Sequence, residues 1–457
     1  MDVRLLHYSD LETALDDPDQ CGSLAGAIQA RRDEQSLVVG SGDDTAPSAL
    51  SLATQGRCAH EFFDAVDPDC ETFGNHDFDF GVDRASELAA GTDHWLCANA
   101  TVEGERFAAE ATEPNRLVAV DGTLVGIIGV AHPETDSINP KAEAVEFCDP
   151  VPVIREQASS LRERGAEYVV VASHCGHGDE RIARETSVDA VLGGHVHDVH
   201  AEEIEGTAVV RPGRAGQRFS EVLLGESTEI AIHTVDDQPV DEGVRDRLRD
   251  RLQTLLAEHG LDEVVGTAAT PIERTEETAT VAESRIGNLV VDAMRWKTGA
   301  DIALSPPGAI RSGPPLADDV TVADLIALTP YDDRLAVVEL TGERLREAFV
   351  AVPFGYYNDG YPDRHCSHVS GARIVWDDSA GELTEVTVGG EPIDDDRRYT
   401  IAVADYLVET SHVNDAFDEA DVIGRYGLAR DAIVEYAREV GLDPTIDGRI
   451  QRPNLER

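Results

Sequence analysis

Short apolar runs that end in polar residues recur along the first half of the chain. Val3–Tyr8 and Leu37–Gly40 are rich in β-forming residues, and each is followed closely by serine and aspartate. Leu124–Val130, Tyr168–Ala172 and Ala190–Leu192 repeat the pattern. Short apolar runs bounded by Gly, Ser or Asp are typical of buried strands. We therefore predict a sheet, and in open α/β sheets sites form beyond the strand ends.

Helical spacing of apolar residues alternates with these runs. Leu24–Arg32 and about Pro152–Arg164 read as helices, and Gly165 is placed to end the second one. Asp241–His259 alternates charged and apolar residues at helical spacing, with Gly260 just beyond. It fits an ordinary surface helix as well as a helix that joins two halves of the chain.

The second half repeats the mixture of helices and strands. Ser284 is a predicted N-cap for a helix that runs through Asn288–Lys297. We place a metal-binding domain at 1–235, a linker helix at 236–262 and a second α/β domain at 263–457. The other elements predicted in this half are helices at Val322–Leu328 and Gly342–Val350 and strands at Asp301–Leu304, Ala336–Leu340, Arg373–Trp376 and Thr400–Ala404.

The net charge of the chain says more about its environment and partners than its length does. The 457 residues include 89 acidic and 38 basic side chains, a formal net charge of −51 spread along the whole chain, and the only lysines are Lys141 and Lys297. Such self-repulsion is best tolerated where salt screens it, so we expect a halophile protein. The same field disfavours binding to a nucleic-acid polymer or to an anionic membrane.

Cysteines and apolar runs indicate the compartment. Seven cysteines with no C-x-x-C pair suit free thiols in a reducing compartment. Residues 1–10 lack the pattern of a signal peptide, and no apolar run is long enough to span a membrane. We expect a cytoplasmic protein, with monomer and homodimer both left open.

Five polar clusters follow strand-like segments of the first half. Each has a structural explanation by itself, because lone aspartates cap turns and a lone histidine is usually a satisfied core residue. Their ordered recurrence instead predicts a metal site. The clusters are Asp10 with Glu12, Gly42-Asp43, Gly74-Asn75-His76, Ser173-His174, and Gly194-His195-Val196-His197.

This mixture of ligand types suits a two-metal site. One carboxylate can bridge two cations about 3.5–4 Å apart while imidazoles and hard oxygen ligands fill the other positions. His, Asp and Asn together suit Mn, Fe, Zn or Co better than Ca or Mg alone. Two such cations clamp a phosphoryl group and activate water, so the pattern favours hydrolysis of phosphate esters.

The motifs resemble those of the calcineurin-like metallophosphoesterases, and most closely the 5′-nucleotidase / UDP-sugar hydrolase / 2′,3′-cyclic phosphodiesterase family. The family's D-x-H, GD, GNH, H and GHxH order is present, and the resemblance continues at Ile286–Met294, Ile310-Arg311 and Val369–Gly371. It implies a four-layer α/β/β/α sandwich followed by a smaller α/β substrate-binding domain that swings relative to the first.

The resemblance also implies the roles of the site residues. Carried over by position, Asp10, Asp43 and His197 would hold one divalent metal ion, and Asp43, Asn75, His174 and His195 the other. His76 matches the catalytic histidine and Asp79 the acid that orients it.

The chain departs from the family pattern at several positions. The family's D-x-H reads Asp10-Leu11-Glu12, so a carboxylate replaces an imidazole. Glu12 as a ligand would favour a harder metal such as Mn; the alternative is that the replacement leaves that metal site weak. The family's Asn-Gly-Gly-Gly-Ile-Arg loop reads 306–311 Pro-Pro-Gly-Ala-Ile-Arg, which keeps Arg311 as a phosphate-binding residue. Its aromatic clamp on the base would be Tyr331 and Tyr406, but the expected Gly-Gly-Asp reads 410–412 Thr-Ser-His. The two tyrosines are equally well explained as ordinary core aromatics.

The expected function is hydrolysis of nucleotide phosphate esters by a dinuclear metal-hydroxide mechanism. The substrate would be a small-molecule phosphate ester or nucleotide. One alternative is a phosphodiesterase acting on cyclic nucleotides or nucleotide sugars. A second is a degenerate relative that binds a nucleotide or metal without turnover, which Glu12 and the altered substrate loops motivate.

Overall fold

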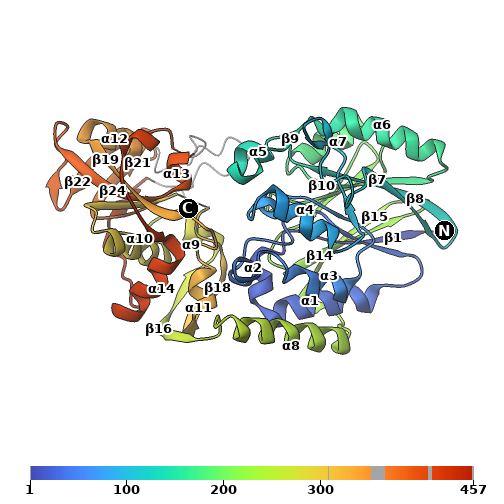
Figure 1. The fold of residues 1–457 in the computed structure, drawn as a ribbon, viewed down its shortest axis with the longest axis horizontal. Helices are drawn as coiled ribbons and strands as arrows, with labels where there is room; N and C mark the ends of the chain where they lie inside the picture. The colour runs from blue at the N-terminus through green and yellow to red at the C-terminus, as the bar shows by residue number, and fades with distance from the viewer. Residues whose placement is uncertain (1, 307, 351–365, 410–413, 455–457) are drawn as a thin grey trace. The chain divides into compact units, whose positions relative to one another are not determined.

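The computed structural model describes residues 2–306, 308–350, 366–409 and 414–454, and it divides into two compact units, Met1–His259 and Gly260–Arg457 (Figure 1). None of the helices in these described ranges has both the length and the apolar character needed to cross a membrane. We call the two parts unit 1 and unit 2.

Unit 1 is built on two sheets that share one core. Leu5 and Val39 of the four-stranded sheet lie in the same buried cluster as Ile127, Val170 and Leu192 of the six-stranded sheet. The side chains between the two sheets therefore form the main core of this unit. The four-stranded sheet has the order β15 (Glu229–Thr234), β14 (Arg218–Leu224), β1 (Val3–Tyr8), β2 (Ser36–Gly40), and the six-stranded sheet β12 (Val199–Ile204), β13 (Thr207–Pro212), β11 (Ala190–Gly193), β10 (Tyr168–His174), β8 (Thr123–Ala131), β7 (Asn115–Val120).

Strand direction in these sheets places the predicted site residues. β1 runs parallel to β2, and β8, β10, β11 and β13 run parallel to one another. The register of β10 on β8 pairs His174 with Ala131 at the ends of the two strands. Because parallel strands end at the same edge of a sheet, the polar residues that follow them are brought together.

Helices cover the outer faces of unit 1. Ile154 of α6 (Pro150–Glu163) and Ile182 of α7 (Gly178–Glu185) pack with Val171 and Val209 of the six-stranded sheet. α1 (Pro18–Arg31) packs on β14, and Figure 1 shows α1 and α6 on opposite sides of the strands. The α/β fold class is confirmed. Smaller elements complete the unit: α2 (Ala49–Thr54), α3 (Ala59–Val66), β3 (Glu71–Thr72), α4 (Val82–Ala90), β4 (Trp95–Leu96), β5 (Ala100–Val102), β6 (Glu105–Arg106), α5 (Thr135–Ile138) and β9 (Glu146–Phe147).

The helix predicted at Asp241–His259 is α8 (Glu242–Glu258). Asp241 caps it by accepting the Val244 amide, as its position before the apolar repeat indicates. α8 packs on α1 and α3 and falls within unit 1, whose boundary lies between His259 and Gly260. The helix α8 is therefore part of unit 1.

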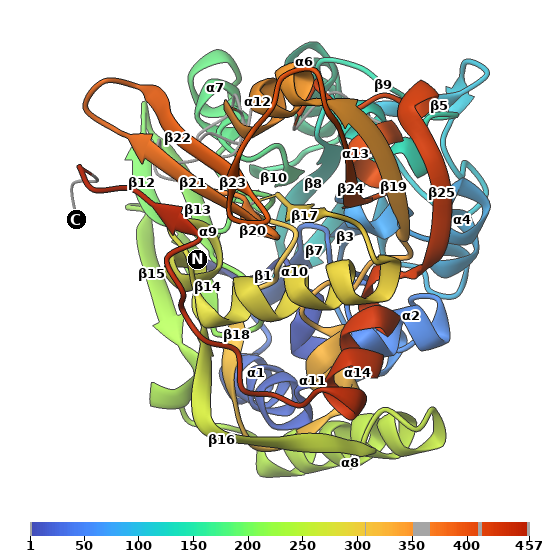
Figure 2. The ribbon, with the colours of Figure 1, turned by 90° about the vertical axis from the view of Figure 1, so that its left-hand side faces the viewer.

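Unit 2 has a five-stranded mixed sheet at its centre and helices on both of its faces. α10 (Arg285–Thr298) begins at Ser284, whose side chain accepts the Gly287 amide as predicted. Figure 2 shows α10 beside α14 (Ala429–Glu439). The sheets are β20 (His368–Ser370), β17 (Ile302–Ser305), β24 (Arg398–Ala404), β19 (Arg334–Thr341), β25 (Val422–Leu428); then β23 (Glu391–Pro392), β22 (Glu382–Val388), β21 (Ala372–Asp377), β26 (Ile450–Gln451); and β16 (Val264–Arg274) with β18 (Gly313–Thr321).

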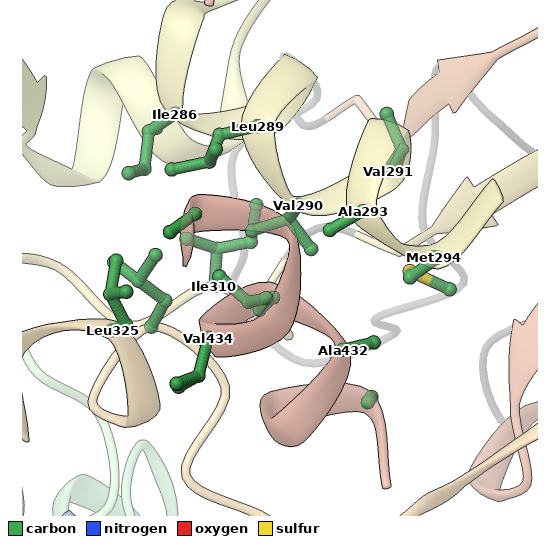
Figure 3. Packing of buried hydrophobic residues seen from close by; sticks show 14 of the residues in the cluster. Ile286, Leu289, Val290, Val291, Ala293, Met294, Ile310, Leu325, Ala432 and Val434 are labelled. Carbon is green, nitrogen blue, oxygen red and sulfur yellow. The ribbon is translucent and has the colours of Figure 1, made fainter. Parts of the chain in front are cut away.

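Two cores hold unit 2 together. In the first, Leu289 and Val290 of α10 meet Ile310, Leu325 and Val434, the last from α14 (Figure 3). The second core lies on the other face of the five-stranded sheet. Its helices are α12 (Gly342–Val350) and α13 (Tyr406–Glu409), and the remaining helices of the unit are α9 (Glu276–Thr280) and α11 (Val322–Ile326).

Candidate metal centre

Each predicted ligand stands at or just beyond the end of a strand in unit 1. Asp10 follows β1, Asp43 follows β2 and Asn75 follows β3, while His174 is the last residue of β10 and His195 follows β11. Because they stand at the ends of these strands, side chains that are far apart in the sequence are brought together.

The turns that carry these side chains use unusual backbone. Asp10, Glu12, Asp43 and His195 have φ values of 52°, 45°, 56° and 74°, in the left-handed region that non-glycine residues rarely adopt. Each such residue costs about 1–3 kcal/mol and persists only where its surroundings hold it. Strain concentrated at one group of polar residues is the pattern found at functional sites.

Close approach of two turns requires glycine next to Asp43. A Cβ on Gly74 would lie 2.2 Å from Oδ1 of Asp43, and one on Gly42 would lie 2.4 Å from the Gly74 nitrogen. No side chain fits there, so the glycines of the Gly-Asp and Gly-Asn-His motifs permit the contact between their turns.

The structure assembles the predicted ligands into three overlapping groups. Within each group, one ligand atom per residue lies within 4.8 Å of the others. Asp43 belongs to two of the groups. The groups are Asp43 with His174 and His195; Asp10 with Glu12 and His197; and Glu12 with Asp43 and His76.

The Asp43 group has the arrangement that a metal ligand set needs. Nε2 of His174 lies 3.0 Å from Oδ2 of Asp43, and its Nδ1 lies 2.7 Å from the Ser41 carbonyl, to which it donates. A backbone carbonyl that holds one ring nitrogen leaves the other free to ligate. Asn75 joins the group, because its Oδ1 lies 2.8 Å from Nδ1 of His195.

Glu12 lies among the other ligands although it stands where the resemblance expects an imidazole. It is 1% exposed, and its Oε1 lies 3.2 Å from Nε2 of His197, which is 3.5 Å from Oδ1 of Asp10. On the far side of the ring, Arg214 lies 2.9 Å from Nδ1 of His197 and donates to it. The carboxylate at position 12 thus occupies the space of a ligand to the first metal.

Charge couples these groups strongly. Burial by itself would raise the pKa of Asp43, but the His174 and His76 imidazoles lower it to about 2. Burial would likewise lower the pKa of His174, but the Asp43 carboxylate raises it to about 10. Burial and the neighbouring His174 hold the pKa of His195 far below its usual value. A cation at this place would take over the role that the His174 proton has beside Asp43.

The residues present therefore fit a pair of divalent cations. The donor atoms are carboxylate oxygens, an amide oxygen and imidazole nitrogens, and Asp43 is shared between the groups. The carboxylates, Asn75 and His174 are buried, and the other histidines are half-buried. This set is consistent with a dinuclear site, and its mixture of oxygen and nitrogen suits first-row transition metals.

His76 and Asp79 form the predicted pair beside the metal ligands. Nδ1 of His76 lies 3.2 and 3.1 Å from the two carboxylate oxygens of Asp79. The backbone N–H of His76 donates to Oδ1 of Asp43 at 2.6 Å. The imidazole is therefore oriented by one carboxylate and tied through its backbone to another.

Three buried acids around the site escaped the sequence analysis. Asp77 accepts the Asp43 and Gly74 amides, Asp44 accepts the Leu11 amide, and Glu71 accepts the Gly42 amide and the Tyr8 hydroxyl. Burial and neighbouring carboxylates raise the pKa of Asp77 to about 6 and that of Glu71 to about 8. For Asp44 and Asp77 the signal in the sequence was an acid placed inside or directly next to a motif, whereas Glu71 had no such signal.

His132 and Asn139 were also missed, since they lie on a segment without a motif. The His132 ring stacks on His195, with ring centres 4.9 Å apart and planes at 30°. Asn139 donates to Asp79 at 2.9 Å. Only the fold places this segment against the site.

The predicted substrate residues lie in unit 2. The Arg311 guanidinium lies over the Tyr331 ring, 5.6 Å from its centre, so the structure brings these two together. Tyr406, the first residue of α13, packs against the second core of unit 2. The stretch 410–412 predicted to depart from Gly-Gly-Asp lies outside the described residues.

Comparisons with known proteins show which family model and which curated proteins the chain resembles. Residues 264–419 match the family model described as 5′-nucleotidase, C-terminal domain. Among curated proteins the chain is similar to "Endonuclease YhcR" of Bacillus subtilis, with 24% identity over 516 aligned positions that cover 98% of this chain. The chain spans only 41% of the length of that relative.

Solved structures share the fold over the full chain. The 5′-nucleotidase precursor from Thermus thermophilus matches with a TM-score of 0.82 at 23% identity, covering 100% of both chains. The sulfate thiohydrolase SoxB from the same organism matches with a TM-score of 0.78 at 20% identity, covering 99% of this chain and 97% of that one. The two-domain α/β architecture is thus shared, whatever each protein acts on.

Proposed function

We propose that the chain, whose residues 264–419 match the 5′-nucleotidase C-terminal domain, is a member of the 5′-nucleotidase family and hydrolyses phosphate monoesters of nucleotides with two bound divalent metal ions. The observation that carries the proposal is the position of Asp43, which shares ligand groups with His174 and His195 on one side and with Glu12 and His76 on the other. A carboxylate shared in this way is what a dinuclear phosphoesterase requires.

The residues that would hold the metals divide around Asp43. We assign Asp10, Glu12, Asp43 and His197 to one ion and Asp43, Asn75, His174 and His195 to the other. When bound, such ions supply Lewis-acid stabilisation of the phosphoryl group and activation of water. The carboxylate of Glu12 adds a hard, charged oxygen, so we favour Mn over Zn, Fe or Co.

His76 and Asp79 would act on the reacting phosphate. Asp79 accepts the Nδ1 proton of His76, which leaves Nε2 as the nitrogen that meets substrate. A protonated Nε2 donates to a phosphoryl or leaving oxygen, and the Asp79 charge stabilises the imidazolium while it does so. Such acid–base groups typically contribute about 10²–10⁴-fold to the rate.

We assign substrate recognition in unit 2 to Arg311, Tyr331 and Tyr406. A guanidinium pairs with phosphate oxygens in a fixed fork, and tyrosine rings stack on a nucleobase. The stacking of Arg311 on Tyr331 supports a joint role for these two. Tyr406 rests on the resemblance alone.

Turnover assays test the proposal. The purified chain, in molar salt with Mn²⁺, should release phosphate from nucleoside monophosphates, and His76→Ala should lower kcat by about a hundredfold or more. Asp262→Asn, an exposed change in unit 2, serves as the matched control. No turnover with any added divalent metal, together with no loss on His76→Ala, would overturn the proposal.

A phosphodiesterase is the second candidate, and the similarity to a protein named an endonuclease favours it. Relative rates on a nucleoside monophosphate, a cyclic nucleotide, a nucleotide sugar and a chromogenic diester decide between the two. A degenerate binding relative is separated from both by metal content, since it should hold one tightly bound ion or none.

The working environment is also a proposal. We infer from the net charge of −51 that the protein functions in concentrated salt. From its seven cysteines without a C-x-x-C pair we further propose a reducing, cytoplasmic compartment, with monomer and homodimer both left open. Cell fractionation and light scattering in molar KCl test the last two points.

A further inference from the structure

One side chain outside the ligand set is tied directly to the His76–Asp79 pair. Asn139 lies on the segment between β8 and β9, just before the 3₁₀ turn Pro140–Ala142, and is 8% exposed. It is remote in sequence from every motif of the site, so the contact exists only because the fold returns this segment to the ends of β2 and β3.

Every hydrogen-bonding group of the Asn139 amide is used. Nδ2 donates to the Asn75 carbonyl at 2.8 Å and to Oδ1 of Asp79 at 2.9 Å, while Oδ1 accepts the Lys141 amide at 3.0 Å. Two acceptors face one end of the amide and a donor faces the other. This arrangement fixes which end is nitrogen, because the reversed amide would place an oxygen against two oxygens.

The two acceptors lie at the two ends of the turn that carries His76. Asn75 is the residue before His76, and Asp79 accepts from Nδ1 of His76. Asp79 Oδ1 is shared between His76 and Asn139, so the asparagine restricts the rotation of that carboxylate. Lys141 supports the same turn from outside, since its Nζ donates to the Asp79 carbonyl at 2.9 Å.

We propose that Asn139 is a positioning residue. It restricts the rotation of the Asp79 carboxylate, and that carboxylate in turn orients the His76 imidazole. The inference rests on the proposed function, and it assigns to Asn139 no contact with substrate or metal. Its loss lets the Asp79 carboxylate rotate, so His76 spends less time in the reactive orientation. Substrate binding and metal content stay as they are, because neither uses Asn139.

Asn139→Ala tests this, and Asn99→Ala is its matched control. Asn99 is also a buried asparagine with two donated bonds and one accepted bond, to Ala131 and Cys148 at the ends of the same segment, but it does not touch Asp79. Asn139→Ala should lower kcat about tenfold with KM and bound metal unchanged, the size of effect typical of lost supporting contacts. Asn99→Ala should lower the thermal midpoint by about as much as Asn139→Ala does, but it should keep kcat within about twofold of the parent.

A double-mutant cycle separates positioning from loss of structure. In a His76→Ala background, Asn139→Ala should change kcat by less than about twofold, since there is no imidazole left to orient. A full tenfold loss in that background, or a fall in bound metal, would overturn the proposal. An unchanged kcat in the single variant would overturn it as well.

A spectroscopic readout keeps the inference testable if the chain shows no turnover at all, which would be a failure of the proposed function. In the full chain labelled with ¹⁵N-histidine, the Nδ1 proton of His76 is identified by its absence in His76→Ala. Its signal should persist in Asn99→Ala and be lost or broadened by exchange in Asn139→Ala. An unchanged signal in Asn139→Ala would overturn the inference independently of activity.

Discussion

Nε2 of His174 and Oδ2 of Asp43 lie 3.0 Å apart at the ends of β10 and β2, in full burial. The two strands belong to different sheets of unit 1, so this contact joins the sheets at the site edge. A buried charged pair of this kind is costly unless it has further partners. A bound cation is the partner that the surrounding donors indicate.

Removing the shared carboxylate should therefore weaken both metal positions. Asp43→Asn keeps the size of the side chain but removes the charge between the two groups of ligands. We expect bound metal to fall from two ions per chain to one or none, and kcat/KM to fall by at least about 100-fold. Metal content by mass spectrometry after gel filtration measures this, and Asp83→Asn, on the surface of α4, is the control. Two retained ions would contradict the assignment of Asp43 as the bridge.

Glu12 should set the metal preference. Glu12→His restores the imidazole that the resemblance expects, and histidine tolerates the left-handed backbone at this position better than most residues do. We expect the affinity for Zn²⁺ relative to Mn²⁺ to rise about tenfold or more, because nitrogen replaces a hard charged oxygen. Competition titrations with both metals measure the ratio. Glu12→Gln, which keeps the shape without the charge, should weaken Mn²⁺ binding; equal metal ratios in all three proteins would show that Glu12 is no ligand.

The grouping of the candidate ligands could be predicted from the sequence because it follows a rule of parallel sheets. Asp10, Asp43 and His174 are each next to an apolar run whose length and composition mark it as a strand, so their convergence follows from topology. Helix ends with a strong cap were equally accessible. Ser284 accepts an amide three residues on, as predicted for an N-cap. Asp241, the first residue of the predicted helix, also accepts an amide three residues on and is the N-cap of α8.

The remainder depended on contacts between distant segments. β14 pairs with β1 in antiparallel register, yet Arg218–Leu224 carries no pattern that points to β1. Glu71 looks like a surface residue in the sequence because nothing local shows that it is buried with Tyr8. Asn139 contacts Asp79 although the two lie 60 residues apart in the sequence, with α4, β7 and β8 between them, and no periodicity encodes such a contact. In each case burial by the fold, not local propensity, decides the role of the residue.

Salt should stabilise this protein beyond its effect on ordinary domains. With a net charge of −51, repulsion between surface carboxylates opposes folding, and raising salt from 0.1 to 1 M shortens the screening length from about 10 to about 3 Å. We expect the thermal midpoint to rise by at least about 4 °C between these KCl concentrations, which corresponds to more than about 1 kcal/mol for a domain of this size. An uncharged osmolyte at equal osmolality is the control. A midpoint that does not respond to KCl would contradict the halophile interpretation.

Glu71 should make the stability of the metal-free protein fall as pH rises. Its pKa in the folded protein is raised from 4.5 to about 8, first by burial and then by Asp77. A raised pKa of an acid means that the folded state keeps a proton which the unfolded chain has released. The stabilisation is therefore fully present below pH 4.5 and is lost as pH rises toward about 8, at a cost of a few kcal/mol.

Glu71→Gln cannot ionise and retains an oxygen for the Gly42 amide. We expect urea midpoints of the chelator-treated wild type to fall from about pH 5 to about pH 8 more steeply than those of Glu71→Gln, while Glu34→Gln, an exposed change in the same unit, follows the wild type. Parallel slopes for all three proteins would show that Glu71 does not hold its proton in the fold.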